Sequence, residues 1–244
     1  MLQSAVKNPA QFLIDAVRNS NKEAVRTAVQ DLKTDINAFD NNHLTVLHLA
    51  IQNRDYDMVV LLLSMGADPN APDSIGDTPV FLAAGYGEAK ILEKLLEKNG
   101  DADALNDFNT CALMRAAHND QAECCEILLK HMKKLTVDHQ DDSGETAVMT
   151  AVLSGRTKAL EVLLLQDPDL TLTDNQNRTA YGVASWFDML DANNMMIDYQ
   201  KNGIAASAKA AFAAQDEAAK KARRETQTDS RLSRHAALRN YLRR

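Results

Sequence analysis

Apolar residues recur along the chain in units of about 33 residues. The hexapeptide TVLHLA at Thr45 is followed by TPVFLA at Thr78, CALMRA at Cys111, TAVMTA at Thr146 and TAYGVA at Thr179, at offsets of 33, 33, 35 and 33 residues. In the first four units a leucine pair follows seventeen positions after the first residue. Apolar positions three and four residues apart predict two short helices per unit. The sequence therefore predicts a stack of helical hairpins, because no single hairpin can bury its own apolar face.

Each unit begins with a residue suited to the start of a helix. A threonine hydroxyl at this position can accept a hydrogen bond from the free N–H groups of the first turn. Pro79 follows Thr78, where the missing N–H costs nothing. Cys111 takes the threonine position in the third copy, and we expect the neighbouring Thr110 to cap the helix instead. At the end of the second helix, the sequence GADPN from Gly66 predicts a left-handed turn into an extended finger.

The period, the Thr-Pro-Leu-His-like opening and the GADPN sequence together resemble the ankyrin-repeat family over about residues 8–202. The resemblance implies an all-α fold, an ankyrin-repeat α-solenoid of about six helix-turn-helix repeats with short β-hairpin-like fingers. The predicted repeats cover about residues 8–40, 41–73, 74–106, 107–141, 142–174 and 175–202 of a domain formed by residues 1–202. The first and last copies are more polar than the others, as expected of units that cap a stack.

Some positions depart from the family pattern. Only Thr78 keeps the proline of the opening, and only His48 keeps its histidine, which we expect to bond the backbone of adjoining turns. The glycine between the two helices is present as Gly87 but is replaced by Arg54 one repeat earlier. Because arginine is strained in the left-handed conformation, we expect an adjusted loop at Arg54. Two extra residues within 131–135 predict a longer loop or an additional helical turn.

Residues 203–244 lack the period and form a predicted Ala-rich, basic helical tail. They contain ten Lys or Arg residues and four Asp or Glu residues, a charge of +6 in a chain whose formal charge is −7. The repeats therefore carry a charge of −13. We expect the tail to dock on the last repeat or on the acidic repeat body. The alternative is an adaptor or secreted bacterial effector whose basic tail contacts a membrane, a nucleic acid or a second partner.

The sequence also bears on where the protein acts. No apolar run approaches the ~18–20 residues that cross a bilayer, and the N-terminus lacks the pattern of a secretory signal. Three cysteines do not make a disulfide framework. These features predict folding in a reducing compartment and a cytoplasmic location, with delivery into a host cell as the open alternative.

Candidate chemistry is sparse along the chain. Cys124 and Cys125 occupy helix-packing positions and are predicted to lie in the core. His118 lies seven residues after Cys111, too far along a helix to act as its base. Neither zinc-ligand spacing nor a phosphate-binding glycine loop is present. We therefore expect no catalytic residues, no metal, no cofactor and no small-molecule substrate.

The family resemblance implies a partner protein in the concave groove formed by the fingertips and the exposed side of the first helices. Aromatic residues and arginine at such positions are typical interface anchors. Acidic residues at Asp77, Asp107, Asp142 and Glu145 favour a partner with a basic surface. Two alternatives are that Tyr86 covers a neighbouring loop and that the 186–187 aromatic pair packs under the tail. The predicted contact residues are Leu44, Asn53, Ile75, Asp77, Tyr86, Asp107, Phe108, His118, Asn119, Glu145, Arg178, Trp186 and Phe187.

Overall fold

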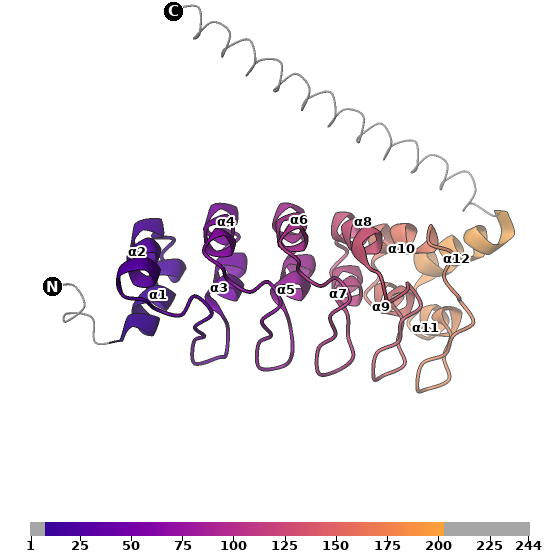
Figure 1. Cartoon of the computed structure of the whole chain (residues 1–244). Helices are drawn as coiled ribbons and strands as arrows, with labels where there is room; N and C mark the ends of the chain where they lie inside the picture. The colour runs from indigo at the N-terminus through magenta and orange to yellow at the C-terminus, as the bar shows by residue number, and fades with distance from the viewer. Residues whose placement is uncertain (1–7, 203–244) are drawn as a thin grey trace, which may run out of the picture. The chain divides into compact units, whose positions relative to one another are not determined.

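The structure is a computed structural model that describes residues 8–202 (Figure 1). The predicted tail, residues 203–244, lies outside the described residues. Contacts within the chain separate two compact units, Met1–Ile197 and Asp198–Arg244.

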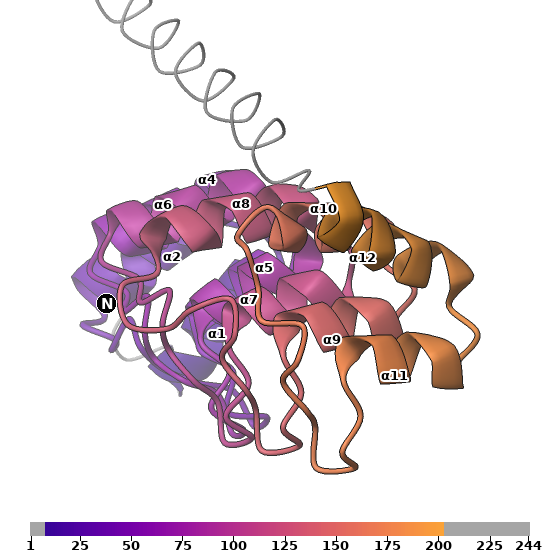
Figure 2. The same cartoon turned by 90° about the vertical axis from the view of Figure 1, so that its right-hand side faces the viewer.

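The described residues form pairs of antiparallel helices joined by finger-like loops, so the predicted all-α stack of helical hairpins is confirmed (Figures 1 and 2). The first helices are α1 (Pro9–Arg18), α3 (Val46–Gln52), α5 (Pro79–Tyr86), α7 (Ala112–His118), α9 (Ala147–Leu153) and α11 (Ala180–Trp186). The second helices are α2 (Lys22–Arg26), α4 (Tyr56–Ser64), α6 (Ala89–Glu97), α8 (Ala122–His131), α10 (Thr157–Leu164) and α12 (Leu190–Asn202). In the first repeat, α2 continues into a π-helical turn, Thr27–Asp31.

The first helices form one row and the second helices form another, with the fingers extending from the row of first helices (Figure 2). Neighbouring first helices pack on one another through small residues, because the alanine at the sixth position of each predicted hexapeptide is fully or almost fully buried. The first leucine of each predicted pair is fully buried on the second helix. These two sets of residues form a core that continues from one repeat to the next. They are Ala50, Ala83, Ala116, Ala151 and Ala184, and Leu62, Leu95, Leu128 and Leu163.

Four of the five predicted threonine caps are observed. The hydroxyl oxygens accept hydrogen bonds from the backbone N–H three residues on; the four are Thr45, Thr78, Thr146 and Thr179. Helix α7 has no side-chain cap, so the prediction that Thr110 replaces Cys111 in this role is wrong. Thr110 belongs to the finger before the helix, where its backbone N–H donates to the side-chain oxygen of Asn106.

The turn between the two helices of a repeat is left-handed with or without glycine. Arg54 has φ of 54°, close to the 58° of Asp120 and the 72° of Gly87. The expected adjustment of the loop at Arg54 is therefore wrong. The turn is fixed by the hydrogen bond from the Asp55 N–H to the Ala50 carbonyl, and the Arg54 guanidinium pairs with Glu88 at 3.3 Å. At Gly87 an added Cβ would lie 2.0 Å from the end of the flexible Gln121 side chain, which would have to move.

The fingers are short hairpins of one repeated design. Isolated antiparallel bridges join Phe39 to Thr45, Leu105 to Cys111 and Gln140 to Thr146. At the start of each finger one Asp or Asn oxygen accepts two backbone N–H groups, from the second and fourth residues after it, as in an Asx turn. These residues are Asp40, Asp73, Asn106, Asp141 and Asp174.

Successive fingertips are also bonded to one another. The Asp107 N–H donates to the Ile75 carbonyl at 3.0 Å, and the Asp142 N–H donates to the Phe108 carbonyl at 3.1 Å. The Asn175 N–H continues the series by donating to the Ser143 carbonyl at 2.9 Å. The tips of the last four fingers therefore form one hydrogen-bonded edge.

The predicted two-residue insertion forms a longer helix and loop. Helix α8 extends to His131, and the following loop is held by Asp103 of the preceding repeat. The Asp103 carboxylate accepts backbone N–H groups from Lys133, Lys134 and Leu135. Burial opposes ionisation of this carboxyl, but the three N–H donors outweigh it and lower the pKa of Asp103. The insertion is thereby tied to the repeat before it.

Candidate functional site

Three large apolar side chains are exposed on the finger side of the third and fourth repeats. Ile75 and Phe108 lie at successive fingertips, with exposed fractions of 41% and 57%. Tyr86 lies at the end of α5 and is 38% exposed. We call the area formed by these residues and the exposed Asp107 the finger-side surface. Its apolar anchors are held by hydrogen-bonded tips and a helix end, so they are positioned before any partner binds.

A cleft of about 200 Å³ lies between α5 and α7 on this surface. Its walls are formed by Asp77, Phe81, Leu82, Gly85, Tyr86, Arg115 and Asn119. The Asn119 side chain donates to the Gly85 carbonyl at 3.0 Å and closes one end. The Arg115 guanidinium lies over the Phe81 ring, 4.9 Å from its centroid, which is a cation–π contact. The cleft thus has an apolar floor and a cationic wall.

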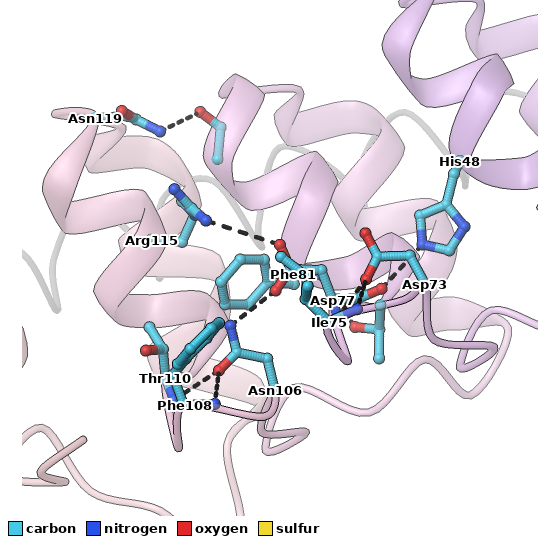
Figure 3. A network of polar contacts seen from close by, with 12 residues as sticks. His48, Asp73, Ile75, Asp77, Phe81, Asn106, Phe108, Thr110, Arg115 and Asn119 are labelled. Carbon is cyan, nitrogen blue, oxygen red and sulfur yellow. Dashed lines mark hydrogen bonds and ion pairs between the residues drawn. The ribbon is translucent and has the colours of Figure 1, made fainter. Parts of the chain in front are cut away.

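A chain of polar contacts extends from the second repeat to this cleft (Figure 3). The Thr45 backbone N–H donates to His48 Nδ1 at 3.3 Å, so His48 Nε2 must carry the ring hydrogen. Nε2 donates to the backbone carbonyl of Asp77 at 3.0 Å. The Asp77 carboxylate accepts from Asn106 Nδ2 at 2.8 Å and lies 3.7 Å from Arg115. The predicted structural role of His48, which bonds the backbone of an adjoining turn, is confirmed.

Burial controls the ionisation of this network. Desolvation lowers the pKa of His48, so the ring stays neutral. Desolvation also raises the pKa of Asp77, although Asn106 and Arg115 act in the opposite direction. Asp77 is only 6% exposed, which corrects the expectation that it faces a partner. Its side chain is enclosed because Asn106, at the start of the following finger, and Arg115 of the next repeat cover it.

The sequence-based contact set misses Arg115. This residue takes a position that is mostly apolar in the other repeats, occupied by Leu49, Leu82, Thr150 and Val183. A single arginine in this position is the signal that could have identified it. Its side chain is 41% exposed and lines the cleft beside Tyr86 and Asn119.

The other predicted contact residues of the first helices are spread along the stack. Exposed Asn53 donates to the carbonyls of Val17 and Arg18 and joins the first two repeats. Exposed His118 lies at the end of α7, where its Nδ1 is 2.9 Å from the Ser154 hydroxyl of the next repeat. These two residues therefore already make contacts between repeats.

The predicted contact residues of the fingers differ in accessibility. Leu44 is half-buried. Glu145 is also half-buried, and desolvation together with Asp141 raises its pKa. Arg178 is bound at 2.7 Å by Asp174 of its own finger. Asp107 lies at a fingertip and is exposed, unlike the other predicted acidic contact residues, Asp77 and Glu145.

The last repeat carries a separate group of exposed apolar residues. Trp186 is 76% exposed, and Phe187 and Leu190 beside it are exposed as well. The Arg178 guanidinium is 6.0 Å from the centroid of the Phe187 ring. The alternative that the 186–187 pair packs under the tail concerns residues 203–244 and lies outside the described residues.

The cysteines are part of the core, as predicted for Cys124 and Cys125. Cys111, Cys124 and Cys125 are all buried free thiols. Desolvation raises the pKa of each, for Cys124 to about 12, so their reactive thiolate forms are disfavoured. Within residues 8–202, no group of three or more His, Cys, Asp or Glu side chains could hold a metal ion. Over the same residues, no helix has both the length and the apolar character of a membrane span.

Comparison with known proteins places these features in context. A family model described as ankyrin repeats in three copies matches residues 2–73 and 71–139. A crystal structure of an ankyrin repeat protein superposes with a TM-score of 0.69 at 26% sequence identity, covering 78% of this chain and 98% of that chain.

Similar sequences occur within proteins of different kinds. The tyrosine-protein kinase HTK16 of Hydra vulgaris is 36% identical over 119 residues, which are 47% of this chain and 16% of the kinase. The putative ankyrin repeat protein FPV014 of Fowlpox virus (strain NVSL) is 31% identical over 115 residues, 47% of this chain and 26% of that protein. The matches thus span less than a third of the length of either relative.

Proposed function

This chain belongs to the ankyrin repeat family, and we propose that it is a non-catalytic scaffold that binds another protein through the finger-side surface. Ankyrin repeats generally mediate protein–protein interactions. The observation that carries the proposal is the exposure of Ile75 and Phe108 at successive fingertips and of Tyr86 at the wall of the cleft. Large apolar side chains in well-positioned surface pockets supply most of the binding energy of protein interfaces.

The charge of the fingertips supports a partner with a basic surface. Asp107 and Asp142 are exposed at neighbouring tips. Asp77 does not contribute to this argument because it is buried, and the half-buried Glu145 contributes less because its pKa is raised. Exposed carboxylates at the rim of an interface mainly accelerate association and select among partners. We therefore expect the tips to meet cationic residues of the partner.

The proposal can be tested with the double variant Tyr86→Ala/Phe108→Ala. Affinity-tagged wild-type and variant proteins are used to capture cellular proteins, which are compared by quantitative mass spectrometry. A partner is assigned only if the purified protein also binds wild type directly by calorimetry. We expect the double variant to weaken that binding at least about a thousandfold, since truncating two interface anchors costs about 2 kcal/mol or more each.

The matched control is Tyr56→Ala on α4, in the row of second helices. Tyr56 is 42% exposed, close to the 38% of Tyr86, so its replacement removes a similar exposed surface away from the fingers. We expect this variant to bind the partner as wild type does, and all variants to keep the wild-type melting temperature within a few degrees. Equal affinity of wild type and Tyr86→Ala/Phe108→Ala for every confirmed partner would contradict the proposal.

A further inference from the structure

We propose that the α5–α7 cleft recognises an acidic residue of the partner, whose carboxylate pairs with Arg115 while an adjacent apolar side chain packs against Tyr86. This inference rests on the proposed function and gives the partner segment a specific chemistry. It adds to the basic character expected opposite the fingertips, because Arg115 lies inside the cleft and not at a tip.

Arg115 is less closely paired with a carboxylate than two other arginines of the stack. Arg18 bonds Asp40 at 2.6 Å, and Arg178 bonds Asp174 at 2.7 Å through both Nε and Nη2. Arg115 Nη2 is 3.7 Å from Asp77 Oδ2, beyond hydrogen-bond distance. Within residues 8–202 the Arg115 guanidinium contacts the Asp77 carboxylate at this distance and the Phe81 ring. A guanidinium has five N–H donors, so Arg115 has donors to offer a partner.

The Arg115 side chain lines the cleft and is 41% exposed, so the N–H groups along the edge of its guanidinium are open to a partner. Its Cζ lies over the Phe81 ring, 4.9 Å from the ring centroid, and this cation–π contact favours that position of the side chain. A carboxylate is the planar acceptor that matches such an edge through two parallel hydrogen bonds. Arg115 is therefore prepared for a carboxylate before the partner arrives.

The charges around Arg115 favour a carboxylate over a phosphate. Asp77 lines the cleft, and both Asp73 and Asp107 lie close enough to Asp77 to affect its ionisation, so several acidic groups surround this part of the site. A dianionic phosphate would meet more repulsion from these groups than a singly charged carboxylate would. A cationic side chain of the partner could not replace Arg115 at Asp77, because the Asp77 side chain is only 9% exposed.

The size and lining of the cleft favour a side chain of a protein segment. Its volume of about 200 Å³ is below the roughly 300–1,000 Å³ of small-molecule sites. Phe81, Leu82 and Tyr86 give it apolar walls next to the cationic one. A segment with an acidic residue and a neighbouring aromatic or aliphatic residue would satisfy both walls.

The test uses a random dodecapeptide library displayed on phage and selected on the purified full chain. We expect the selected peptides to share an Asp or Glu beside an aromatic or aliphatic residue. Changing that acid to Asn or Gln should weaken binding about tenfold or more, as expected for a charged hydrogen bond that is lost. Arg115→Met should weaken the acidic peptide by a similar factor, but should leave the affinity of the amide peptide almost unchanged.

Lys90→Met on α6 is the control, because it removes an exposed positive charge from the row of second helices. It should leave every affinity as in wild type. Peptides that bind without an acid, or that are insensitive to Arg115→Met, would overturn the inference, and so would a failure to select any binder. If such peptides still lose affinity in Tyr86→Ala/Phe108→Ala, the proposed function stands. If they do not, the finger-side surface is not the site of their binding and the proposed function fails with the inference.

Discussion

Asp77 and Asp174 are two of the buried aspartates in residues 8–202 that face an arginine, and they differ in how completely that arginine is bound. Asp174 and Arg178 lie in the same finger, four residues apart, with contacts of 2.7 Å. Asp77 faces Arg115 of the next repeat across 3.7 Å. Arg178 is 16% exposed and Arg115 is 41% exposed. The first arginine stabilises its own finger, whereas the second remains accessible to another molecule.

The pKa values of Asp174 and Asp77 are shifted in opposite directions. The pKa of Asp174 is lowered because its hydrogen bonds to Arg178 and to backbone N–H groups outweigh its burial. The pKa of Asp77 is raised because burial outweighs its single amide donor and the distant guanidinium. The short Asp174–Arg178 ion pair therefore stabilises the fold, whereas the longer Asp77–Arg115 pair leaves its arginine open to binding.

The largest expected effect is that of Asp174→Asn compared with Asp77→Asn. The amide would turn N–H donors toward Arg178 and leave that cation without its partner, which should cost about 3 kcal/mol of unfolding free energy. Asp77→Asn should cost no more than about 1 kcal/mol, because the pair it breaks is already long. Urea unfolding followed by circular dichroism measures both. Equal losses in the two variants would remove the distinction between the two sites.

Arg178→Met should have the next largest effect. It leaves the Asp174 carboxylate buried with only backbone donors, and we expect a loss of about 2 kcal/mol in the same urea experiment. The loss should be smaller in acid, since protonation of Asp174 relieves the unpaired charge. A variant as stable as wild type at neutral pH would show that the closed pair does not support the finger.

A pH titration tests the region around Asp77 separately, because His48 bonds the backbone of Asp77 and not that of Asp174. The folded-state pKa of His48 is below its ordinary value of 6.5, so the unfolded chain binds the proton more readily. The contribution of His48 is present above pH 6.5 and is lost as the pH falls toward its lowered pKa. Unfolding free energy should therefore decrease from about pH 7.5 to about pH 5.5.

His48→Gln should have a shallower dependence over that window, even if it is less stable throughout. Asp77 acts with the opposite sign, because a raised carboxyl pKa means that the folded state holds its proton more tightly as acid is added. The effect of Asp77 on the unfolding free energy occurs at pH values above its ordinary pKa of 3.8, and thus at the acidic end of the titration. Identical pH slopes for wild type and His48→Gln would contradict the assignment of a neutral, buried imidazole.

Arg115→Met should change stability least, by less than about 1 kcal/mol. The variant loses a partly exposed cation–π contact and a long ion pair, each of modest value. Thermal unfolding monitored by calorimetry should show nearly the wild-type melting temperature. A large destabilisation would mean that Arg115 serves the fold in the way that Arg178 does.

Much of the fold follows from the sequence because each repeat has the same local solution. The period, the threonine caps and the buried cysteines depend on residues within one helical hairpin, so their patterns are visible in the chain. The left-handed Arg54 was not predictable from the residue type, because the turn is imposed by the hydrogen bonds and packing of the two helices around it. The family pattern outweighs the local preference at this position.

The candidate site was harder to predict because its features arise between repeats. Phe108 and Tyr86 lie on the surface as expected. Asp77 is enclosed by Asn106 and Arg115, which are 29 and 38 residues further along the chain. No pattern within its own repeat signals that burial. Only the arginine in a mostly apolar position pointed to the cleft.

The bonds between successive fingertips have a consequence for the geometry of any extended ligand. Each finger is a hairpin two strands wide, and neighbouring strands are ~4.8 Å apart, so the tips recur about every 10 Å. A bound extended chain advances ~3.3 Å per residue and therefore meets a new finger about every third residue. The spacing of the tips therefore fixes the spacing of the anchor residues in an extended partner. Inserting or deleting one partner residue between two anchors would move the second anchor away from its finger.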